Sequence, residues 1–437
     1  MEALERRLSS LSVCGRSAPS EPVYLLGVSL APPPGDAVVV SCSDFTLRLH
    51  NRRDLRRLQT HRGHERPVSG VTFSRGSAHT FYSASLDGTV RLWDVRRSGT
   101  DAAQVFRSDA SHSFSALGVS CDDGLLCAGT EQLNNEDSFL VFWDGRKPGG
   151  VLLGVYSESH SDDITQVLFH PTDKDRLASG STDGLVNVFD LSRGAEDDAL
   201  VGTCNSESSV SALCWLGPGR ARLLCVSHDE GLKLWDVDSL ETEDELTVFS
   251  TEDARTTVGR HGNANSAVDY LIGGCWVDSE AQLLVVGGSG GGDVHLFTCD
   301  KPGLSLVRTL RRGHSATVRC FAFDPQSLSL ITGGEDGLLL RWSPEAGAAG
   351  RAAELDVRSS RRTPEEPSLT RHESVMKSES VMKSESVMKS ESVMKSESVM
   401  KSESVMKSES VMKSESVMKL RSRPHKKHKF NRDKKLT

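Results

Sequence analysis

Apolar and polar residues alternate along most of the first 343 positions, in short runs separated by turns. The segment SASLDGTVRLWDVR at 83–96 shows the pattern, with an Asp-Gly turn between two alternating runs and Trp93 near its end. An Asp-Gly pair in this setting is a strong short-range signal for a β-hairpin. Helical periodicity is nearly absent before residue 350, so the pattern predicts an all-β chain.

The hairpin pattern recurs along the chain, with clear copies at 179–192, 225–238 and 332–345 and altered copies at 42–51, 134–146 and 287–300. The residues that close the seven copies are His50, Trp93, Trp143, Phe189, Trp235, Phe297 and Trp342, at spacings of 43, 50, 46, 46, 62 and 45. Most spacings lie near the ~40–45 residues of a four-stranded propeller blade. We interpret the acidic, Thr-rich insert at 241–269, inside the longest spacing, as a surface loop.

Seven copies predict a seven-bladed β-propeller over residues 23–343. A single four-stranded sheet cannot bury both of its faces, whereas sheets stacked around an axis bury each face against a neighbour. The fold class is therefore all-β.

The closing dipeptides resemble those of the WD-repeat family. Trp-Asp pairs stand at 93–94, 143–144 and 235–236, Phe189-Asp190 is a variant, and Gly63-His64 and Gly313-His314 match the family's Gly-His dipeptide. The resemblance covers about residues 23–343.

The resemblance implies a hydrogen-bonded group of His, Ser or Thr, Asp and Trp within a blade. The residues that match it are His64, Ser83, Asp87 and Trp93 in the second blade and His314, Thr332, Asp336 and Trp342 in the seventh. The fourth blade has His160, Ser179 and Asp183, but Phe189 has no indole N–H to donate. The fifth has Cys225 at the Ser position and no matching His. These departures predict blades of uneven stability.

The His, Ser and Asp residues of these groups are also the residue types of a hydrolase triad. A triad needs an exposed nucleophile in a pocket, whereas these sets recur with the turn in blade after blade. The sequence also lacks G-x-x-x-x-G-K-[ST] and H-E-x-x-H motifs. We therefore expect a structural role for the sets and no enzyme, cofactor or metal, and keep catalysis as the least favoured alternative.

The last blade needs a fourth strand, which this family usually takes from the N-terminus. After Trp342 the chain turns to Pro, Ala, Gly, Glu and Arg, whereas RRLSSLSVC at 6–14 can be extended. We predict that residues 8–13, within an N-terminal segment 1–22, form the outer strand of the last blade and leave no free edge at the chain ends.

Charge divides the chain into an acidic body and a basic end. The net charge is -8, residues 373–419 hold eight Glu and eight Lys, and residues 420–437 hold eight Lys or Arg and one Asp, so residues 1–372 carry -15. An acidic body favours basic protein partners and repels nucleic acid. The basic tail at 420–437 is typical of a nuclear localisation signal, with RNA contact as an alternative that the single aromatic Phe430 supports poorly.

Residues 344–372 are rich in Ala, Gly, Arg, Glu and Pro and predict a linker. In the SVMKSE repeat at 373–419 the apolar pair Val-Met recurs every six residues, so in a helix it would point to all sides and form no apolar stripe. We therefore expect a disordered, low-complexity tract. The ten scattered Cys form no C-x-x-C pair, and no run approaches the ~18 apolar residues of a membrane helix. These features predict an intracellular protein, more nuclear than cytoplasmic, that is not in a membrane.

Two segments, Trp93-Asp94-Val95-Arg96 and Trp143-Asp144-Gly145-Arg146, read W-D-x-R. They resemble the box with which substrate receptors of cullin-type ubiquitin ligases dock their adaptor, so Arg96 and Arg146 are candidate partner-binding residues. We expect a non-catalytic nuclear scaffold, monomeric within complexes, for basic partners of the ribosome-assembly or chromatin type. A ligase substrate receptor is the alternative.

Overall fold

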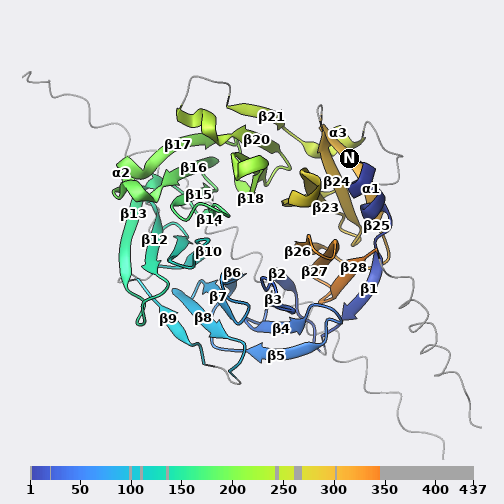
Figure 1. The fold of residues 1–437 in the computed structure, drawn as a ribbon, viewed down its shortest axis with the longest axis horizontal. Helices are drawn as coiled ribbons and strands as arrows, with labels where there is room; N and C mark the ends of the chain where they lie inside the picture. Colours follow the sequence, from blue (N-terminus) through green and yellow to red (C-terminus); the bar gives the residue numbers. More distant parts are fainter. Residues whose placement is uncertain are drawn as a thin grey trace, which may run out of the picture. The chain divides into compact units, whose positions relative to one another are not determined.

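A computed structural model describes residues 2–19, 21–97, 101–108, 112–133, 137–241, 246–259, 268–300 and 303–344. Within this part of the chain, the strands form seven four-stranded antiparallel sheets that follow one another around a ring (Figure 1). The predicted all-β, seven-bladed propeller is confirmed. The linker beyond residue 344, the SVMKSE repeat and the basic tail lie outside the described residues.

Blades are numbered in chain order, and the four strands of each blade are given from the ring axis outward. Blades 1 and 2 consist of β2 (Leu25–Leu30), β3 (Ala37–Cys42), β4 (Leu47–Asn51) and β5 (Arg57–His61), and of β6 (Val68–Phe73), β7 (Thr80–Ser85), β8 (Thr89–Asp94) and β9 (Gln104–Phe106). Blades 3 and 4 consist of β10 (Phe114–Val119), β11 (Leu125–Thr130), β12 (Ser138–Asp144) and β13 (Leu152–His160), and of β14 (Ile164–Phe169), β15 (Arg176–Ser181), β16 (Leu185–Asp190) and β17 (Leu200–Asn205).

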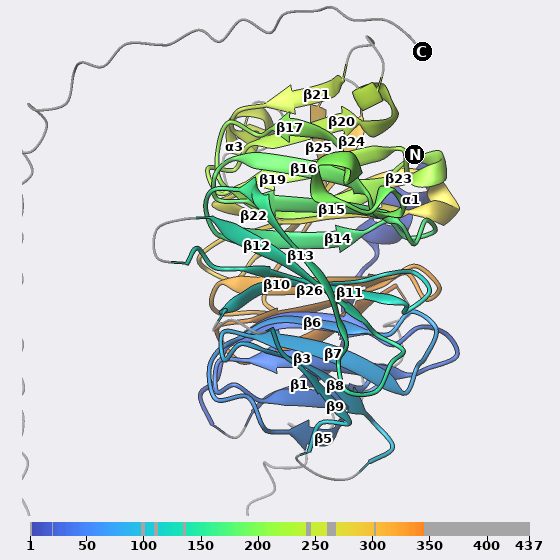
Figure 2. The same cartoon turned by 90° about the vertical axis from the view of Figure 1, so that its left-hand side faces the viewer.

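The remaining blades complete the ring between blade 4 and blade 1 (Figure 2). Blades 5 and 6 consist of β18 (Val210–Leu216), β19 (Arg222–Ser227), β20 (Leu232–Asp236) and β21 (Thr247–Thr251), and of β22 (Tyr270–Val277), β23 (Gln282–Gly288), β24 (Val294–Asp300) and β25 (Gly303–Leu310). Blade 7 consists of β26 (Val318–Asp324), β27 (Ser329–Gly334), β28 (Leu339–Ser343) and β1 (Ser12–Ser17). The short helices are α1 (Glu2–Ser9), η1 (Leu191–Arg193), α2 (Glu196–Ala199), η2 (Pro218–Arg220), η3 (Val237–Glu241), α3 (Ala254–Gly259) and η4 (Asp278–Glu280).

The closing residues of the seven sequence repeats occupy one equivalent place, on the third strand of each blade. There each pairs with an apolar residue of the second strand, as Trp93 does with Phe81 and Phe189 with Leu177. Even the atypical His50 keeps this register, opposite Val38. The repeat register read from the sequence is therefore the register of the strands.

The hydrophobic core is divided into seven clusters, each lying between two neighbouring blades. Between blades 1 and 2, for example, Val39 and Leu49 pack with Phe81 and Trp93. Both faces of each sheet are therefore covered, as the stacking argument requires.

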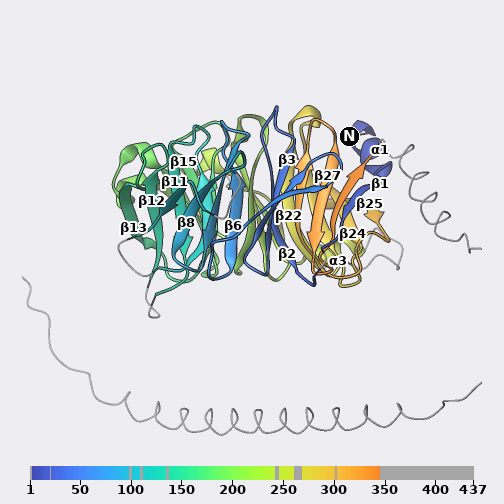
Figure 3. The ribbon, with the colours of Figure 1, turned by 90° about the horizontal axis from the view of Figure 1, so that it is seen from below.

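The ring closes through β1, which pairs antiparallel with β28 from Ser12 opposite Ser343 to Ser17 opposite Leu339. The predicted range 8–13 for this strand is wrong, because residues 2–9 form α1 and the strand begins only at Ser12. The reason is the spacing of Leu4 and Leu8, which places both on one face of α1, with Leu11 two residues beyond the end of the helix. They are buried in the cluster between blades 6 and 7, with α1 beside β25 (Figure 3).

The interpretation of the insert at 241–269 as a surface loop is incomplete. The insert contains β21, the outer strand of blade 5, and the helix α3. Val248 and Phe249 of this strand pack against the cluster between blades 5 and 6. The acidic composition of the insert led to the prediction of a loop, although the insert contains the fourth strand of blade 5.

All ten cysteines lie within the described residues and are thiols rather than disulfides. None of the helices in the described part of the chain is both long and apolar enough to cross a membrane.

Candidate functional site

The polar group of blade 2 joins the four residues that the sequence singled out. His64 lies in the connection before β6, and its Nε2 and Nδ1 lie 2.7 Å from Ser83 Oγ and 2.8 Å from Asp87 Oδ2. Trp93 Nε1 donates to the same Ser83 Oγ at 2.8 Å. The chain of contacts therefore runs from the turn carboxylate through the imidazole and hydroxyl to the indole.

Blade 7 repeats this arrangement with Thr in place of Ser. His314 Nε2 lies 2.8 Å from Thr332 Oγ1, its Nδ1 lies 3.0 Å from Asp336 Oδ1, and Trp342 Nε1 donates to Thr332 at 2.9 Å. Each group thus joins the connection before the first strand of its blade to the second strand, the third strand and the turn between these two strands.

Burial and hydrogen bonding act in opposite directions on the charges of these groups. Burial disfavours ionised Asp87, but the hydrogen bonds from His64 and Thr89 outweigh it and hold the pKa of this carboxyl well below its usual value. Burial lowers the pKa of His314, although the neighbouring Asp336 opposes the shift. The turn carboxylate of blade 2 is therefore ionised at neutral pH.

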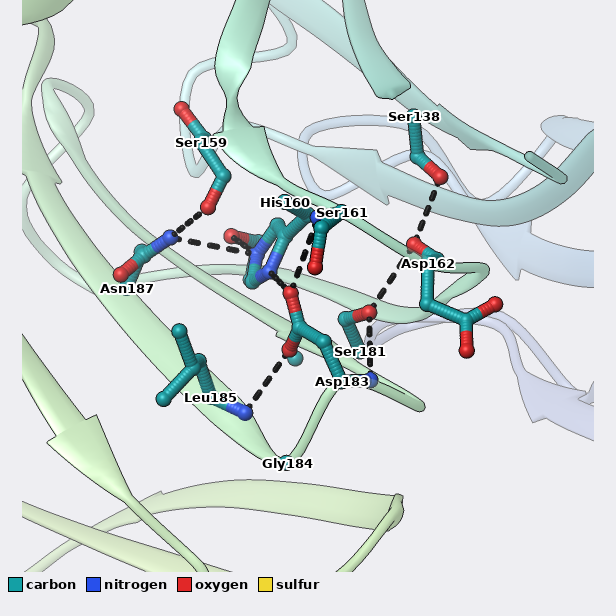
Figure 4. A network of polar contacts seen from close by, with 12 residues as sticks. Ser138, Ser159, His160, Ser161, Asp162, Ser181, Asp183, Gly184, Leu185 and Asn187 are labelled. Carbon is teal, nitrogen blue, oxygen red and sulfur yellow. Dashed lines mark hydrogen bonds and ion pairs between the residues drawn. The ribbon is translucent and has the colours of Figure 1, made fainter. Parts of the chain in front are cut away.

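Blade 4 has the same core of contacts but a different extension (Figure 4). His160 Nε2 lies 2.7 Å from Ser179 Oγ and its Nδ1 lies 3.1 Å from Asp183 Oδ2. Phe189 supplies no donor to Ser179, as the sequence indicated. Instead Asn187 Nδ2 approaches the carbonyl of Ser159 and, at 3.5 Å, His160 Nε2. Asn187, which stands two residues before Phe189 on the same strand face, was not among the residues predicted from the sequence.

The geometry of these groups leaves no room for triad chemistry at them. Ser83 and Ser179 have no exposed surface, and the Ser83 hydroxyl already contacts both an imidazole and an indole. A nucleophile must reach its substrate, and these two buried hydroxyls are not accessible to one.

Arg96 and Arg146 lie in the connections after the third strands of blades 2 and 3. We call this side of the ring the Arg96 face: it carries the connections between the first and second strands of all seven blades and between the third and fourth strands of blades 1–6. The side chains are 65% and 67% exposed. Each nevertheless turns to an acidic residue of its own chain.

The two arginines differ in how tightly they are held. Arg96 forms a fork with Asp94, through Nε at 2.9 Å and Nη2 at 2.7 Å, and these bonds lower the pKa of Asp94 to about 2. Arg146 lies 3.8 Å from Asp122 and 3.8 Å from Asp144. The donors of Arg146 are thus more available than those of Arg96.

An acidic crevice also opens on the Arg96 face, between blades 4 and 5. Its volume is about 500 Å³, and its charged lining comprises the carboxylates Asp173, Asp175, Asp190 and Asp238 and the guanidinium groups Arg176 and Arg193. Arg176 lies 3.3 Å from Asp238, and Arg193 lies 3.0 Å from Asp190. Asp173 forms no ion pair among the described residues.

This crevice could not be predicted from the sequence, because its residues come from three connections, and from the strand ends beside them, in two blades. One signal was available, since Asp190 follows Phe189 at the variant Trp-Asp position. In the described residues, no group of three or more His, Cys, Asp or Glu gathers as a metal site requires.

Comparisons with known proteins agree with this architecture. The sequence model of the family described as "WD domain, G-beta repeat" matches residues 55–94, 150–190 and 304–343. The chain is 25% identical over 325 residues to the WD repeat-containing protein 89 homolog of Dictyostelium discoideum, covering 73% of this chain and 82% of that protein. It is 31% identical over 331 residues to the WD repeat-containing protein GTS1 of Arabidopsis thaliana, covering 71% of this chain and 79% of that protein.

A more distant relative carries a name that indicates a process. The chain is 28% identical over 180 residues to the ribosome biogenesis protein ytm1 of Pyrenophora tritici-repentis. This similarity covers 41% of the chain and 36% of that protein.

Proposed function

The chain belongs to the WD-repeat family, and we propose that it is a non-catalytic nuclear scaffold that binds basic proteins on the Arg96 face of its propeller. The ring supplies a rigid frame, because each blade is held by its neighbours and by the polar groups within it. Such a frame presents fixed loops to partners without needing chemistry of its own.

The acidic crevice is the observation that carries this proposal. Four carboxylates face two guanidinium groups in a space of about 500 Å³, which leaves room for Lys or Arg side chains of a partner. The net charge of -15 on residues 1–372 adds a long-range attraction for basic proteins. Ribosomal proteins and histones are strongly basic, so they fit this charge.

Between these two classes, the comparisons favour ribosome assembly. The ribosome biogenesis proteins of Pyrenophora tritici-repentis and of Oryza sativa match part of this chain. A role in the nucleus also accords with the basic segment 420–437.

The test is affinity purification of the full chain from nuclear extract, with mass spectrometry. The Asp173→Asn/Asp238→Asn variant removes two crevice charges almost without changing shape. Asp197→Asn/Asp198→Asn is the matched control, because these exposed acids of α2 lie in blade 4 but outside the crevice. We expect the first variant to lose basic ribosome-assembly proteins and the control to keep them. Equal recovery with both variants would contradict the crevice as the binding site.

A second candidate function is that of a substrate receptor for a cullin-type ubiquitin ligase. The exposure of Arg96 and Arg146 on adjacent blades supports it, whereas the Arg96–Asp94 fork competes with a partner carboxylate. The same purification with Arg96→Ala/Arg146→Ala tests it. Adaptor and cullin subunits that disappear in this variant support a receptor, and their absence from the wild-type sample rules it out.

Localisation is tested separately by fluorescence of the full chain and of a chain that lacks residues 420–437. We expect nuclear fluorescence that depends on this segment, since clustered Lys and Arg are read by import receptors. Cytoplasmic fluorescence of the full chain would contradict the nuclear part of the proposal.

A further inference from the structure

A second cavity lies at the seam where the ring closes, between blades 7 and 1. Its volume is about 150 Å³, and its lining includes Ser17, Leu25, Arg48, His50, Arg57 and Leu339. Ser17 belongs to the closing strand β1, whereas Arg48 and His50 belong to β4 of blade 1. The cavity is therefore complete only when the N-terminal strand has joined blade 7.

Two guanidinium groups from blade 1 line this cavity. Arg48 has a side chain only 10% exposed, and its Nη2 donates to Asp44 at 2.9 Å, so it is fixed in place. Its Nη1 has no hydrogen-bond partner among the described residues. Arg57 is exposed and forms no ion pair within the described part of the chain. One carboxylate, Asp44, thus stands against two permanent positive charges.

The third group is the buried imidazole of His50. Its Nδ1 lies 2.8 Å from the carbonyl oxygen of Leu55, which can only accept, so Nδ1 carries the hydrogen. In the neutral ring Nε2 then offers a lone pair. Burial favours this neutral form, and the nearby Arg57 and Arg48 add to it, so the pKa of His50 is lowered.

We propose that this cavity binds a phosphoryl group, either free phosphate or the phosphate monoester of a modified side chain. Arg48 and Arg57 pair with its charged oxygens, and His50 Nε2 accepts a hydrogen bond from its P–OH. Guanidinium groups bind phosphate oxygens through strong charge-assisted hydrogen bonds. A water takes up about 30 Å³, so the cavity has room for a tetrahedral ion of several such volumes.

The combination of groups distinguishes this ligand from a carboxylate or a sulfate. Those anions have no O–H at neutral pH, so they leave the Nε2 lone pair of His50 without a donor. Hydrogen phosphate carries both charged oxygens and an O–H at neutral pH. A phosphate monoester does so in its singly protonated form, which loses this proton with a pKa of about 6.

Binding has a consequence for the closing of the ring. A ligand held by blade 1 beside Ser17 of β1 binds only the closed ring, so it stabilises the folded chain in proportion to its occupancy. The melting temperature then reports binding.

The first experiment measures the melting temperature of the full chain in rising inorganic phosphate, with chloride adjusted to keep the ionic strength constant. Phosphate also stabilises proteins in general by exclusion from their surface. Arg57→Gln is therefore compared with Arg56→Gln, which removes the same charge from the neighbouring exposed residue outside the cavity. We expect phosphate to raise the melting temperatures of the wild type and of Arg56→Gln equally. Arg57→Gln should bind phosphate about 10- to 100-fold more weakly, so its melting temperature should rise less.

The second experiment distinguishes the two sources of the phosphoryl group by calorimetry with inorganic phosphate and with N-acetyl-phosphoserine amide. Binding of both probes supports recognition of a phosphorylated side chain, and binding of phosphate alone supports the free ion. Equal melting shifts in Arg57→Gln and Arg56→Gln, or no binding of either probe to the wild type, would overturn the proposal.

Discussion

Arg52 and Asp324, which stand 272 positions apart in the sequence, form an ion pair across the seam between the first and last blades. Arg52 Nη1 lies 3.3 Å from Asp324 Oδ2, and the two side chains are 11% and 6% exposed. Asp324 also accepts from the hydroxyl of Ser327 at 2.7 Å. The seam is thus held by a desolvated charge pair as well as by the strand β1.

Removal of one partner of this pair should strongly destabilise the ring. In Arg52→Ala the carboxylate of Asp324 stays buried without its cation, which costs about 3–5 kcal/mol of unfolding free energy. Urea denaturation measures this cost. Arg53→Ala is the control, because its pair with Asp36 is exposed on both sides, and such pairs contribute about 0–1 kcal/mol. Similar losses of unfolding free energy in both variants would show that the buried seam pair contributes no more to stability than an exposed pair.

The helix α1 should behave as part of the core. Leu8 is 1% exposed in the cluster between blades 6 and 7, so Leu8→Ala should lower the unfolding free energy by about 2–5 kcal/mol. Exposed Arg7 on the same helix is the control, since its contact with Glu280 at 3.7 Å is a weak surface pair. If Leu8→Ala unfolds at the same urea concentration as Arg7→Ala, the helix is not docked as described.

The polar groups of blades 2 and 4 offer a matched comparison. Ser83→Ala leaves both His64 Nε2 and Trp93 Nε1 without a partner, whereas Ser179→Ala affects only His160. A buried polar group left unpaired costs about 1–3 kcal/mol. We therefore expect Ser83→Ala to destabilise the chain more than Ser179→Ala by about 1 kcal/mol or more, as read from urea midpoints at equal slope. The reverse order would contradict a role for the indole contact.

Stability should fall as the pH drops from about 7 to about 5. Burial lowers the pKa of His61, His295 and His314, so below their unfolded pKa of about 6.5 the unfolded chain binds protons that the folded chain does not. Unfolding is therefore favoured by acid in this window. The lowered pKa of Asp87 affects stability only below about pH 4, so its effect does not overlap with that of the histidines.

Melting temperatures at pH 7.5, 6.5 and 5.5 would measure this dependence. His295→Asn is a useful variant, because Asn can keep a partner for Thr309, which lies 3.1 Å from His295 Nδ1, but cannot titrate. We expect a shallower pH slope in this variant. A wild-type slope of zero, or one of opposite sign, would contradict the role assigned to the buried histidines.

The sequence by itself determined the features that repeat. Alternation with period two, Asp-Gly turns and closing residues such as Trp93 are local signals, so the number of blades and their register could be predicted. The resemblance to the WD-repeat family implied the His64 and His314 groups. Prediction failed where two patterns competed over a short segment. Around Leu8 the sequence pattern is compatible with an extended strand, but the four-residue spacing of Leu4 and Leu8 fits the helix that the segment forms.

Only the tertiary structure decided which distant residues meet between blades. Arg52 with Asp324, the crevice of blades 4 and 5 and the cavity beside Ser17 all join connections that no local pattern relates. The physical reason is that the repeat fixes each blade, while the contacts between blades depend on how the finished sheets stack around the axis. The acidic crevice and the cavity beside Ser17 lie at those contacts, so no local pattern in the sequence could predict them.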